Sequence, residues 1–458
     1  MNYIFFGINL IVIFSIAFTM NLLSKPHKNV LLENTLSPDH LQHPDVLALV
    51  AEYRRRIMQF VGILSVASLI FLFNLYGSIL MTFFWLLLFL LLGASYVLQI
   101  HYIGKMHELI EHKNWGLPID PVLVDTKLIQ QKNRKLLPLV SFLPSLLLVI
   151  AGVIYFPTAE NGPGWLFSLI NCLIFLLFLY LWQVIRRLPV RPLTKDFQIN
   201  QQFNDLTKFY WSLLVVLMST GTLLLFFVPL LSTQLTGVVG ELSAVLFVLL
   251  LVFLMVVPFG LLLRLRKKQD QLLASTEQRY YDEDRYWRYG VYINPTDPRL
   301  FVPDRVGLNI GINLGKKTGK GLAIGTGILM IAIMVVTIVP LYQLDFNPDA
   351  ISGEMTDQSV QFDAPLASRQ TIPLDEIRTV TLVDTLPEPT VRTMGMATDH
   401  YLTGNFNVAG QSAKLFMDKH RNPFFGSRQP ISRSTIRTKT PLRPSNCMRL
   451  WSKSFSRQ

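Results

Sequence analysis

Charged residues are scarce in this chain: Asp, Glu, Lys and Arg make up 16% of its 458 residues, whereas 51% are hydrophobic and 31 are Phe. Soluble globular domains usually carry about 25% charged residues. The shortage excludes an ordinary soluble domain and indicates that a membrane is the main solvent of the chain.

Cysteine is almost missing as well, since Cys172 and Cys447 are the only two. Their placement fits neither a disulfide framework nor a metal-binding spacing, so we expect no metal and no cofactor. No nucleophile paired with a base can be identified, and we expect no catalytic residues and no enzymatic activity. An extracytoplasmic domain without a disulfide of its own favours a bacterial source.

Charge is missing altogether from a set of apolar runs that are each long enough, at about 20 residues, to cross a bilayer. The first run has no basic residue before its apolar stretch and no clear small-residue cleavage site, so we interpret it as a retained helix and not as a signal peptide. The runs lie near 3–22, 59–77, 79–103, 137–156, 164–185, 209–231, 242–263 and 321–341.

Lys and Arg lie in every second connection between these runs. Segments 23–58, 104–136, 186–208 and 264–320 hold 5, 6, 5 and 12 of them, whereas the short connections hold none. Because short basic loops stay cytoplasmic, the alternation predicts four inner segments, an extracytoplasmic N-terminus and an extracytoplasmic C-terminal domain. The basic inner face suits anionic lipid headgroups.

Basic residues beside the spans are predicted to anchor them by reaching the headgroups. The net charge of +12 does not indicate nucleic-acid binding, because residues 426–458 alone hold 8 Lys or Arg and no acid. The predicted anchors are Arg54, Arg55, Arg56, Arg186, Arg187, Arg264, Arg266, Lys267 and Lys268.

Few polar residues lie within or beside the spans. Asn9, Asn74 and Asn171 are predicted to form hydrogen bonds between helices. Gly321, Gly325 and Gly327 have the small-x-x-x-small spacing that allows close helix packing, and we expect them to pack against another helix of the same chain, with dimerisation as the alternative.

The fold class that follows is a polytopic α-helical membrane protein of about eight transmembrane helices, with a small cytoplasmic α+β domain and a small β-rich extracytoplasmic domain. Residues 1–267 form the membrane domain with seven spans, 268–320 the cytoplasmic domain and 321–341 the eighth span.

The rest of the chain, residues 342–458, can be divided by its composition. Residues 342–371, rich in Asp, Ser, Gln and Pro, are predicted to be a linker. Residues 372–425 are predicted to be the ectodomain, with strands at 379–383 and 402–408. Residues 426–458 are predicted to be a disordered basic tail, and a frameshift is one explanation for so abrupt a change of composition.

Two short stretches nearly match known catalytic motifs. His107 and His112 are five residues apart, whereas zinc peptidases need a spacing of four, so we expect a solvated helix with Glu108 and His112 as neighbours and no metal site. In 311–318 the two glycines are separated by three residues instead of four, which excludes a phosphate-binding loop.

Within the predicted cytoplasmic domain, 306–314 alternates apolar residues with Gly and Asn, which predicts a strand. The stretch 284–313 resembles the family catalogued as domain of unknown function 5808, found in membrane proteins of Gram-positive bacteria. The resemblance implies structural residues and no catalytic ones. It is carried by Tyr286, Trp287, Gly290, Asn294, Pro295, Asp297, Pro298, Phe301, Gly307 and Asn313.

Residues 372–425 are similar to a bacterial pleckstrin-homology-like domain, which implies a small, strongly bent β structure that ends early here. The loop with Lys105 and Trp115 is distantly similar to SdpI-type immunity and signalling membrane proteins. We therefore expect a non-enzymatic protein of the bacterial cytoplasmic membrane that senses, confers immunity or regulates through its ectodomain. Its expected partners are the lipid bilayer and an extracellular peptide or envelope protein; a transporter or channel component is the alternative.

Overall fold

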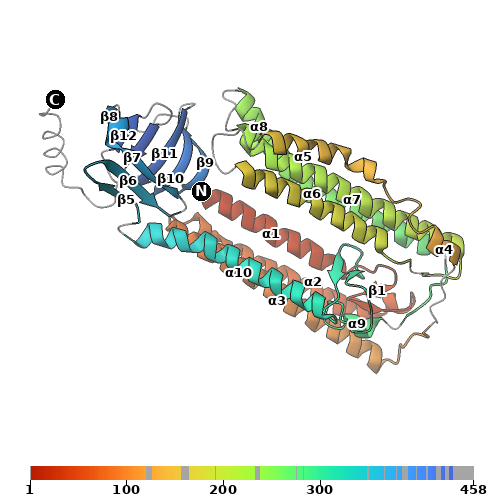
Figure 1. The fold of residues 1–458 in the computed structure, drawn as a ribbon. Coiled ribbons are helices and arrows are strands. Elements are labelled where there is room, and N and C mark those ends of the chain that lie inside the picture. Colours follow the sequence, from red (N-terminus) through yellow and green to blue (C-terminus); the bar gives the residue numbers. More distant parts are fainter. Residues whose placement is uncertain are drawn as a thin grey trace, which may run out of the picture.

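A computed structural model of the chain shows an elongated molecule with two groups of long helices and β-sheets at one end (Figure 1). The structure describes residues 2–119, 126–155, 164–190, 192–232, 238–274, 276–281, 283–347, 350–365, 367–377, 379–383, 390–398, 400–408, 411–418, 424–428 and 433–436. Cys447 and most of the predicted tail lie outside these residues.

Among the described residues, seven helices are long and apolar enough to cross a membrane, which confirms a multi-pass helical membrane protein. The run predicted at 137–156 is a shorter apolar helix, α5 (Leu143–Tyr155), preceded by a 3-10 turn, η3 (Leu139–Phe142). The seven are α1 (Asn2–Leu23), α2 (Pro44–Ala67, continued by η2, Ser68–Leu72), α3 (Gly77–His112), α6 (Gly164–Arg187), α7 (Phe197–Ser232), α8 (Val238–Leu273) and α10 (Lys317–Phe346).

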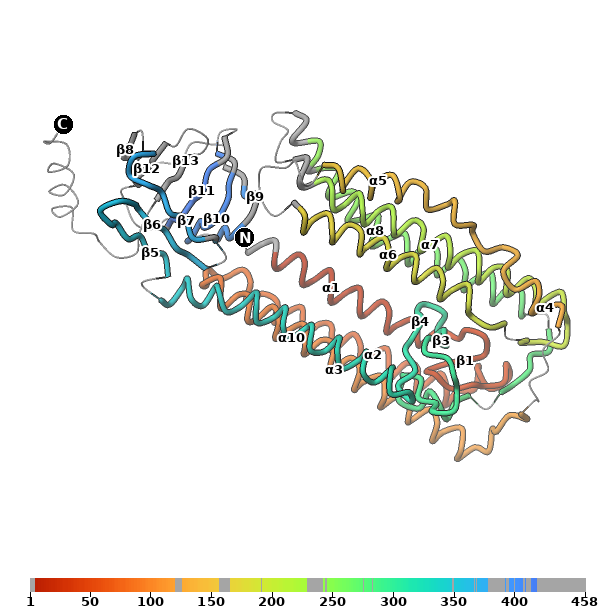
Figure 2. The backbone as a smooth tube through the Cα atoms, viewed as in Figure 1, coloured from red at the N-terminus to blue at the C-terminus, as the bar shows by residue number. Residues whose placement is uncertain are grey.

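The helices form two groups, and Figure 2 shows them as separate layers. Helices α1, α2 and α3 share one apolar core, and α10 lies along α3; α5 to α8 pack on one another. The predicted polar contacts are present in each group, since Asn9 Nδ2 donates to Ser68 Oγ at 2.6 Å and Asn171 Nδ2 donates to the Val149 carbonyl at 3.3 Å. Asn74 is exposed.

Several helices extend well beyond the apolar runs that predicted them. Helix α2 begins at Pro44, where proline suits the first helical position and the His43 side chain accepts a hydrogen bond from Asp45 N. The segments before span two and after span three are thus partly helical. No helix breaker separates the polar and apolar parts of either helix, so the helix continues through both.

Small elements occupy the end of the molecule opposite the β-sheets. Besides α4 (Thr126–Gln130), they comprise the hairpin of β1 (Val30–Leu31) and β2 (Asn34–Thr35), η1 (His40–Gln42), α9 (Asp284–Trp287) and the hairpin of β3 (Phe301–Pro303) and β4 (Ile310–Ile312). The strand predicted over 306–314 is confined to β4. Asp304 Oδ1 accepts hydrogen bonds from Gly307 N and Leu308 N, so 304–308 is a turn.

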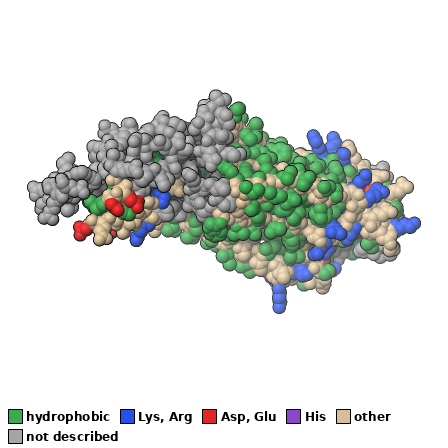
Figure 3. Space-filling view, turned by 45° about the horizontal axis from the view of Figure 1, so that its top comes forward, with side chains coloured by type: hydrophobic (Ala, Val, Ile, Leu, Met, Phe, Trp, Pro, Cys, Tyr) green, Lys and Arg blue, Asp and Glu red, His purple; other side chains and the backbone are tan. Residues whose placement is uncertain are grey.

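We call this the basic end and define it as residues 24–43, 264–274 and 284–316. In Figure 3 hydrophobic side chains cover the middle of the visible face, and Lys and Arg gather away from the β-sheets.

None of the side chains in the most apolar stretch of α10 is buried. Gly321 and Gly325 have open space beside them, so the prediction that they pack within the chain is wrong.

The predicted linker is instead a three-stranded antiparallel sheet of β5 (Ser352–Met355), β6 (Ser359–Ala364) and β7 (Ala367–Pro373). Its apolar side chains Ile351, Phe362 and Ile372 are buried with Phe416 of the following sheet. Polar residues occupy the opposite positions of these strands, and they gave the segment its linker-like composition.

A six-stranded sheet follows, in the order β8-β12-β13-β11-β10-β9. It confirms the strands predicted at 379–383 and 402–408, which are β8 and most of β10. The described part of the predicted tail is not disordered, because it contributes to β12 and forms β13. The strands are β8 (Thr379–Val383), β9 (Thr390–Ala397), β10 (Tyr401–Val408), β11 (Gln411–Asp418), β12 (Phe424–Arg428) and β13 (Arg433–Ile436).

Candidate functional site

The family-motif residues predicted from the sequence come together in one unit at the basic end. We call residues 24–36 and 284–316 the loop module. Its centre is Asn313, whose side chain is fully buried. Asn313 Oδ1 accepts from Asn294 N at 3.1 Å and Gly315 N at 2.9 Å, and its Nδ2 donates to the carbonyls of Asn294 at 2.8 Å and Arg299 at 3.1 Å. One amide thus replaces the backbone pairing that this irregular loop lacks.

A second set of contacts surrounds Asp297 in the same loop. Tyr292 OH donates to Asp297 Oδ2 at 2.8 Å, and Arg299 Nε donates to Asp297 Oδ1 at 2.9 Å. Burial by itself raises the pKa of Asp297, but the hydrogen bonds from Arg299 and Tyr292 outweigh it and hold the pKa at about 2. Asp297 is therefore a permanent structural carboxylate.

Aromatic and glycine residues of the motif fix the outer parts of the module. Trp287 is buried with its ring centroid 5.3 Å from that of Tyr292, which also contacts Tyr286 at 5.9 Å. Gly290 and Gly307 adopt φ values of +67° and +78°, a region that favours glycine.

The other motif residues join the module to its surroundings. The Phe301 ring lies 6.2 Å from that of Tyr180 on α6, and the Pro298 carbonyl accepts a hydrogen bond from Lys316 Nζ at 2.5 Å. A Cβ on Gly315 would collide with the backbone of Asn294 and Pro295.

The two parts of the loop module are joined by hydrogen bonds and an ion pair between residues far apart in sequence. Thr35 donates to the Asp284 carboxylate through N at 2.9 Å and Oγ1 at 2.6 Å. Arg305 Nη1 donates to the Glu33 carbonyl at 2.6 Å and lies 2.7 Å from Asp284 Oδ1. The N-terminal hairpin is therefore a structural component of the 284–316 unit.

Two carboxyl groups lie between these parts, that of Glu33 buried and that of Asp304 half-buried. Burial raises the pKa of Glu33 to about 8 although Arg305 acts in the opposite direction. Its Oε2 has no hydrogen-bond partner within the described chain. Burial also raises the pKa of Asp304 to about 6, although backbone N–H groups bond its carboxylate. Glu33 is thus protonated at neutral pH, which avoids burying a charge.

His27 is buried beside them, with Nδ1 2.8 Å from Asp270 Oδ1 on α8. Burial lowers the pKa of His27 to about 3, and this effect exceeds the opposite influence of Asp270. The contact is therefore a hydrogen bond from a neutral imidazole and not an ion pair. The ring also lies against Gly307, where a Cβ would approach Nε2 to 2.7 Å.

One predicted anchor has a different role. Arg266 is buried, and its guanidinium donates to the carbonyls of Leu22 and Val306, each at 3.3 Å, and of Pro26 at 3.2 Å. It does not reach headgroups, because it caps the open end of α1 and joins it to α8 and the loop module. The other predicted anchors are exposed.

Lys208 is a buried cation that the sequence assigned to a loop, although it lies on α7. Its Nζ donates to the carbonyls of Ile185 at 2.5 Å, Leu188 at 3.0 Å and Arg186 at 3.3 Å, at the end of α6. Lys208 thus supplies the hydrogen bonds that this helix end lacks. In the sequence, only the position of Lys208 just before an apolar run indicated such a role.

In the histidine stretch, which is the last part of helix α3, His107 Nε2 lies 3.2 Å from Glu111 Oε1 at the i, i+4 spacing. Among the described residues, no group of three or more His, Cys, Asp or Glu side chains is placed to hold a metal ion.

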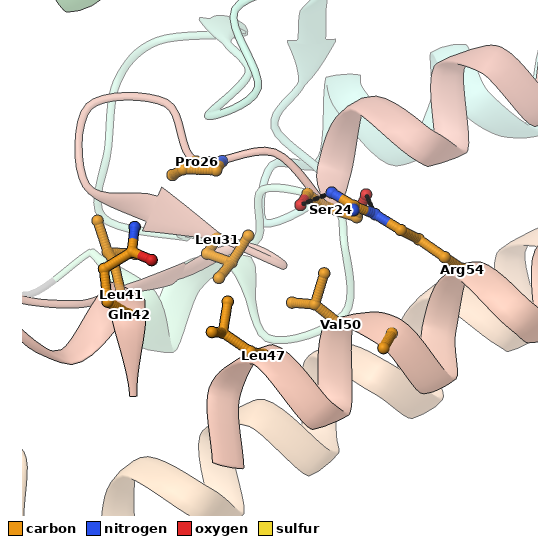
Figure 4. Close-up of a pocket in the computed structure, with 9 residues that line it drawn as sticks. Ser24, Pro26, Leu31, Leu41, Gln42, Leu47, Val50 and Arg54 are labelled. Atoms are coloured by element: carbon orange, nitrogen blue, oxygen red, sulfur yellow. Dashed lines mark hydrogen bonds between the residues drawn. The ribbon is translucent and has the colours of Figure 1, made fainter. Parts of the chain in front are cut away.

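A pocket of about 390 Å³ opens beside the loop module (Figure 4). On one wall Arg54 Nε donates to Ser24 Oγ at 2.8 Å and Nη2 donates to the Ser24 carbonyl at 3.0 Å. Apolar side chains form most of the other walls. The lining residues are Ser24, Pro26, Leu31, Leu41, Gln42, Leu47, Val50, Ala51 and Arg54.

Comparisons of the chain with family models, with curated proteins and with solved structures find no match. The chemistry of the site therefore has to be inferred from its own residues.

Proposed function

We propose that this chain is a non-enzymatic membrane protein that senses or regulates by binding a partner through its β-rich domain, which comprises the strands β5 to β13. Binding there would change the conformation of the loop module. The observation that carries the proposal is that α3 contacts both units, the β-rich domain at its start and the loop module between Tyr96 and Ile103. Helix α10, which lies along α3, also joins the two units covalently.

At the β-rich end, the helix pair is tied to the sheets by a short set of contacts. The ring of Tyr76, just before α3, lies 5.3 Å from Phe346 on α10 and 5.7 Å from His400 beside β10. Ser78 N donates to Asp345 Oδ2 at 2.8 Å. A displacement of the sheets would therefore shift side chains at the adjoining ends of both helices.

Contacts continue along the pair to the basic end. Trp85 Nε1 on α3 donates to Thr337 Oγ1 on α10 at 2.9 Å. Farther along α3, Tyr96 OH donates to the Tyr289 carbonyl at 3.0 Å, and the Gln99 side chain lies against Gly290. This series supports a relay through packed side chains.

The charge distribution supports a specific placement of these units. With eight crossings and the basic segments inside, the loop module is the cytoplasmic domain, and the β-rich domain faces outward in a bacterial cytoplasmic membrane. The resemblance of 372–425 to a pleckstrin-homology-like domain supports binding of a peptide or an envelope protein there. Transport receives less support, because Lys208 and Arg266 are both held by carbonyl oxygens.

The relay can be tested with hydrogen exchange on the full chain in lipid nanodiscs. Tyr76→Ala removes the aromatic contact at the β-rich end, and we expect amides of 289–294 to exchange at least about twofold faster. Trp165→Ala, on an exposed side chain of α6, is the matched control and should leave them unchanged. Changes confined to 392–401 and the start of α3 would contradict a relay.

Coupling between two sites is reciprocal, so the opposite perturbation gives an independent check. Asn313→Ala disturbs the centre of the loop module, and faster exchange is expected at 400–406 in the β-rich domain. Normal exchange there, with a clear change in the loop module itself, would show that the two units behave independently.

A further inference from the structure

The pocket at the basic end combines an oriented cation with apolar walls. Ser24 is buried, and it fixes the Arg54 guanidinium through two hydrogen bonds. An arginine has five N–H donors, so the remaining ones stay available. No acidic residue lines the pocket, and Leu31 and Val50 form a buried apolar floor.

The end of the pocket at Arg54 matches the level of lipid headgroups, because Arg54 is the lining residue of α2 nearest to its apolar part and Leu47 and Val50 lie one to two turns farther away. Arg54 begins a run of three arginines, and α2 contains no charged residue from Ile57 to its end at Ala67. Basic residues at such a boundary lie at the headgroup level, where phosphates and the first acyl carbons occur together. Leu47, one wall of the pocket, is 48% exposed although it is apolar.

We infer that this pocket binds an anionic phospholipid of the bilayer. The phosphate accepts charge-assisted hydrogen bonds from Arg54, and the headgroup beyond the phosphate extends between Leu31, Leu47 and Val50. A volume of about 390 Å³ admits such a headgroup while both acyl chains stay in the membrane. This site is separate from the partner-binding role proposed for the β-rich domain and does not depend on it.

Several features favour a lipid over a soluble phosphate. A free phosphate would use the cation alone and would leave the apolar walls in water, whereas the carbon atoms of a phosphatidylglycerol headgroup cover part of these walls. Arg55 and Arg56 add positive charge on the next positions of the helix, which attracts an anionic headgroup. The exposed side chain of Gln42 lines the pocket and can donate to the headgroup.

The test uses the delipidated full chain in detergent, titrated with dioleoyl phosphatidylglycerol and followed by native mass spectrometry. Arg54→Gln removes the cation, and Leu47→Asp places a charge on the apolar wall without touching the Arg54–Ser24 contact. We expect each to weaken the tightest lipid-binding step about tenfold. Arg187→Gln, the same change at an exposed arginine of α6, is the matched control and should leave this step unchanged.

Thermal unfolding of each variant separates a lost site from a lost fold, and Leu47→Asp keeps the proposal testable if Arg54→Gln unfolds. Equal weakening by Arg187→Gln would overturn the proposal in favour of general attraction to a basic surface. Equal affinity for dioleoyl phosphatidylcholine would overturn the selectivity for anionic lipid. Displacement of the lipid by millimolar inorganic phosphate would show that a soluble anion is the ligand.

Discussion

Lys208 Nζ on α7 lies 2.5 Å from the carbonyl oxygen of Ile185 in the last turn of α6. The side chain is 1% exposed, and its hydrogen-bond partners within the described residues are carbonyl oxygens. The negative end of the α6 dipole makes the position favourable for a cation. A charge beside an apolar run thus serves to end one helix and to join it to the next.

Lys208→Met should destabilise the protein by about 2–4 kcal/mol, because the carbonyls of Ile185 and Leu188 lose a charged donor and stay buried. Denaturant unfolding in detergent measures the change. Lys195→Met, at an exposed lysine paired with Glu277, is the control and should cost less than about 1 kcal/mol. Equal effects of the two substitutions would show that Lys208 is not a helix cap.

Arg266→Lys keeps the charge but loses the planar fork that reaches Leu22, Pro26 and Val306 together. We expect a loss of about 2 kcal/mol in unfolding free energy and faster amide exchange in 22–27. Arg264→Lys, two residues earlier and exposed, is the matched control. Unchanged exchange in Arg266→Lys would assign the arginine to simple packing.

Glu33 predicts an unusual pH dependence of stability. Its pKa is raised from 4.5 to about 8, so the folded state keeps a proton that the unfolded state loses. Stability should therefore decline as pH rises from about 4.5 to about 8 and then level off. Glu33→Gln removes this part of the decline and should stabilise the protein most at pH 8 and above.

The measurement is the unfolding temperature of both proteins across this pH range. Glu277→Gln, at an exposed carboxylate, serves as the control. Parallel curves for wild type and Glu33→Gln would mean that the buried carboxyl is not protonated in the folded state.

His27 predicts the opposite slope at lower pH. Its pKa is lowered from 6.5 to about 3, so the unfolded state binds a proton that the folded state excludes. Stability should fall as pH drops below about 6.5, and His27→Gln should flatten this fall. Thermal unfolding between pH 4 and pH 7 would reveal it, and an unchanged slope in the variant would place the acid sensitivity elsewhere.

Sidedness can be measured with single cysteines in a Cys172→Ala, Cys447→Ser background. An impermeant reagent on intact cells should label Asp357→Cys, between β5 and β6, and spare Glu277→Cys, beyond the end of α8. Both positions are exposed, so accessibility within the protein does not bias the comparison. The reverse pattern would invert the topology inferred from the basic loops.

The sequence predicted those parts of the fold that depend on a local pattern. Uncharged runs located the membrane helices, and β-branched stretches located β8 and β10. The three strands β5 to β7 were missed, because one polar face dominated their composition. Their apolar positions, such as Phe362, become a core only when the next sheet supplies Phe416.

The roles of individual charged residues were beyond the sequence for a related reason. Nothing local distinguishes Arg266 from Arg264, since both lie in the same basic run. Their difference comes from the carbonyls of Leu22 and Val306, which only the tertiary fold brings to α8. The family-motif residues were located together by resemblance, but the bonds of Asn313 that explain them required the structure.

The contact of Thr35 with Asp284 spans 249 residues and has a consequence for biosynthesis. When the ribosome has made α1 to α3, Leu32 and Leu36 can already pack against these helices and Asn34 can bond to the Ile103 carbonyl, but Thr35 still lacks Asp284. Such distant contacts form late and delay folding. The edge of the hairpin at Thr35 therefore remains accessible to water, chaperones and proteases until translation has passed residue 305.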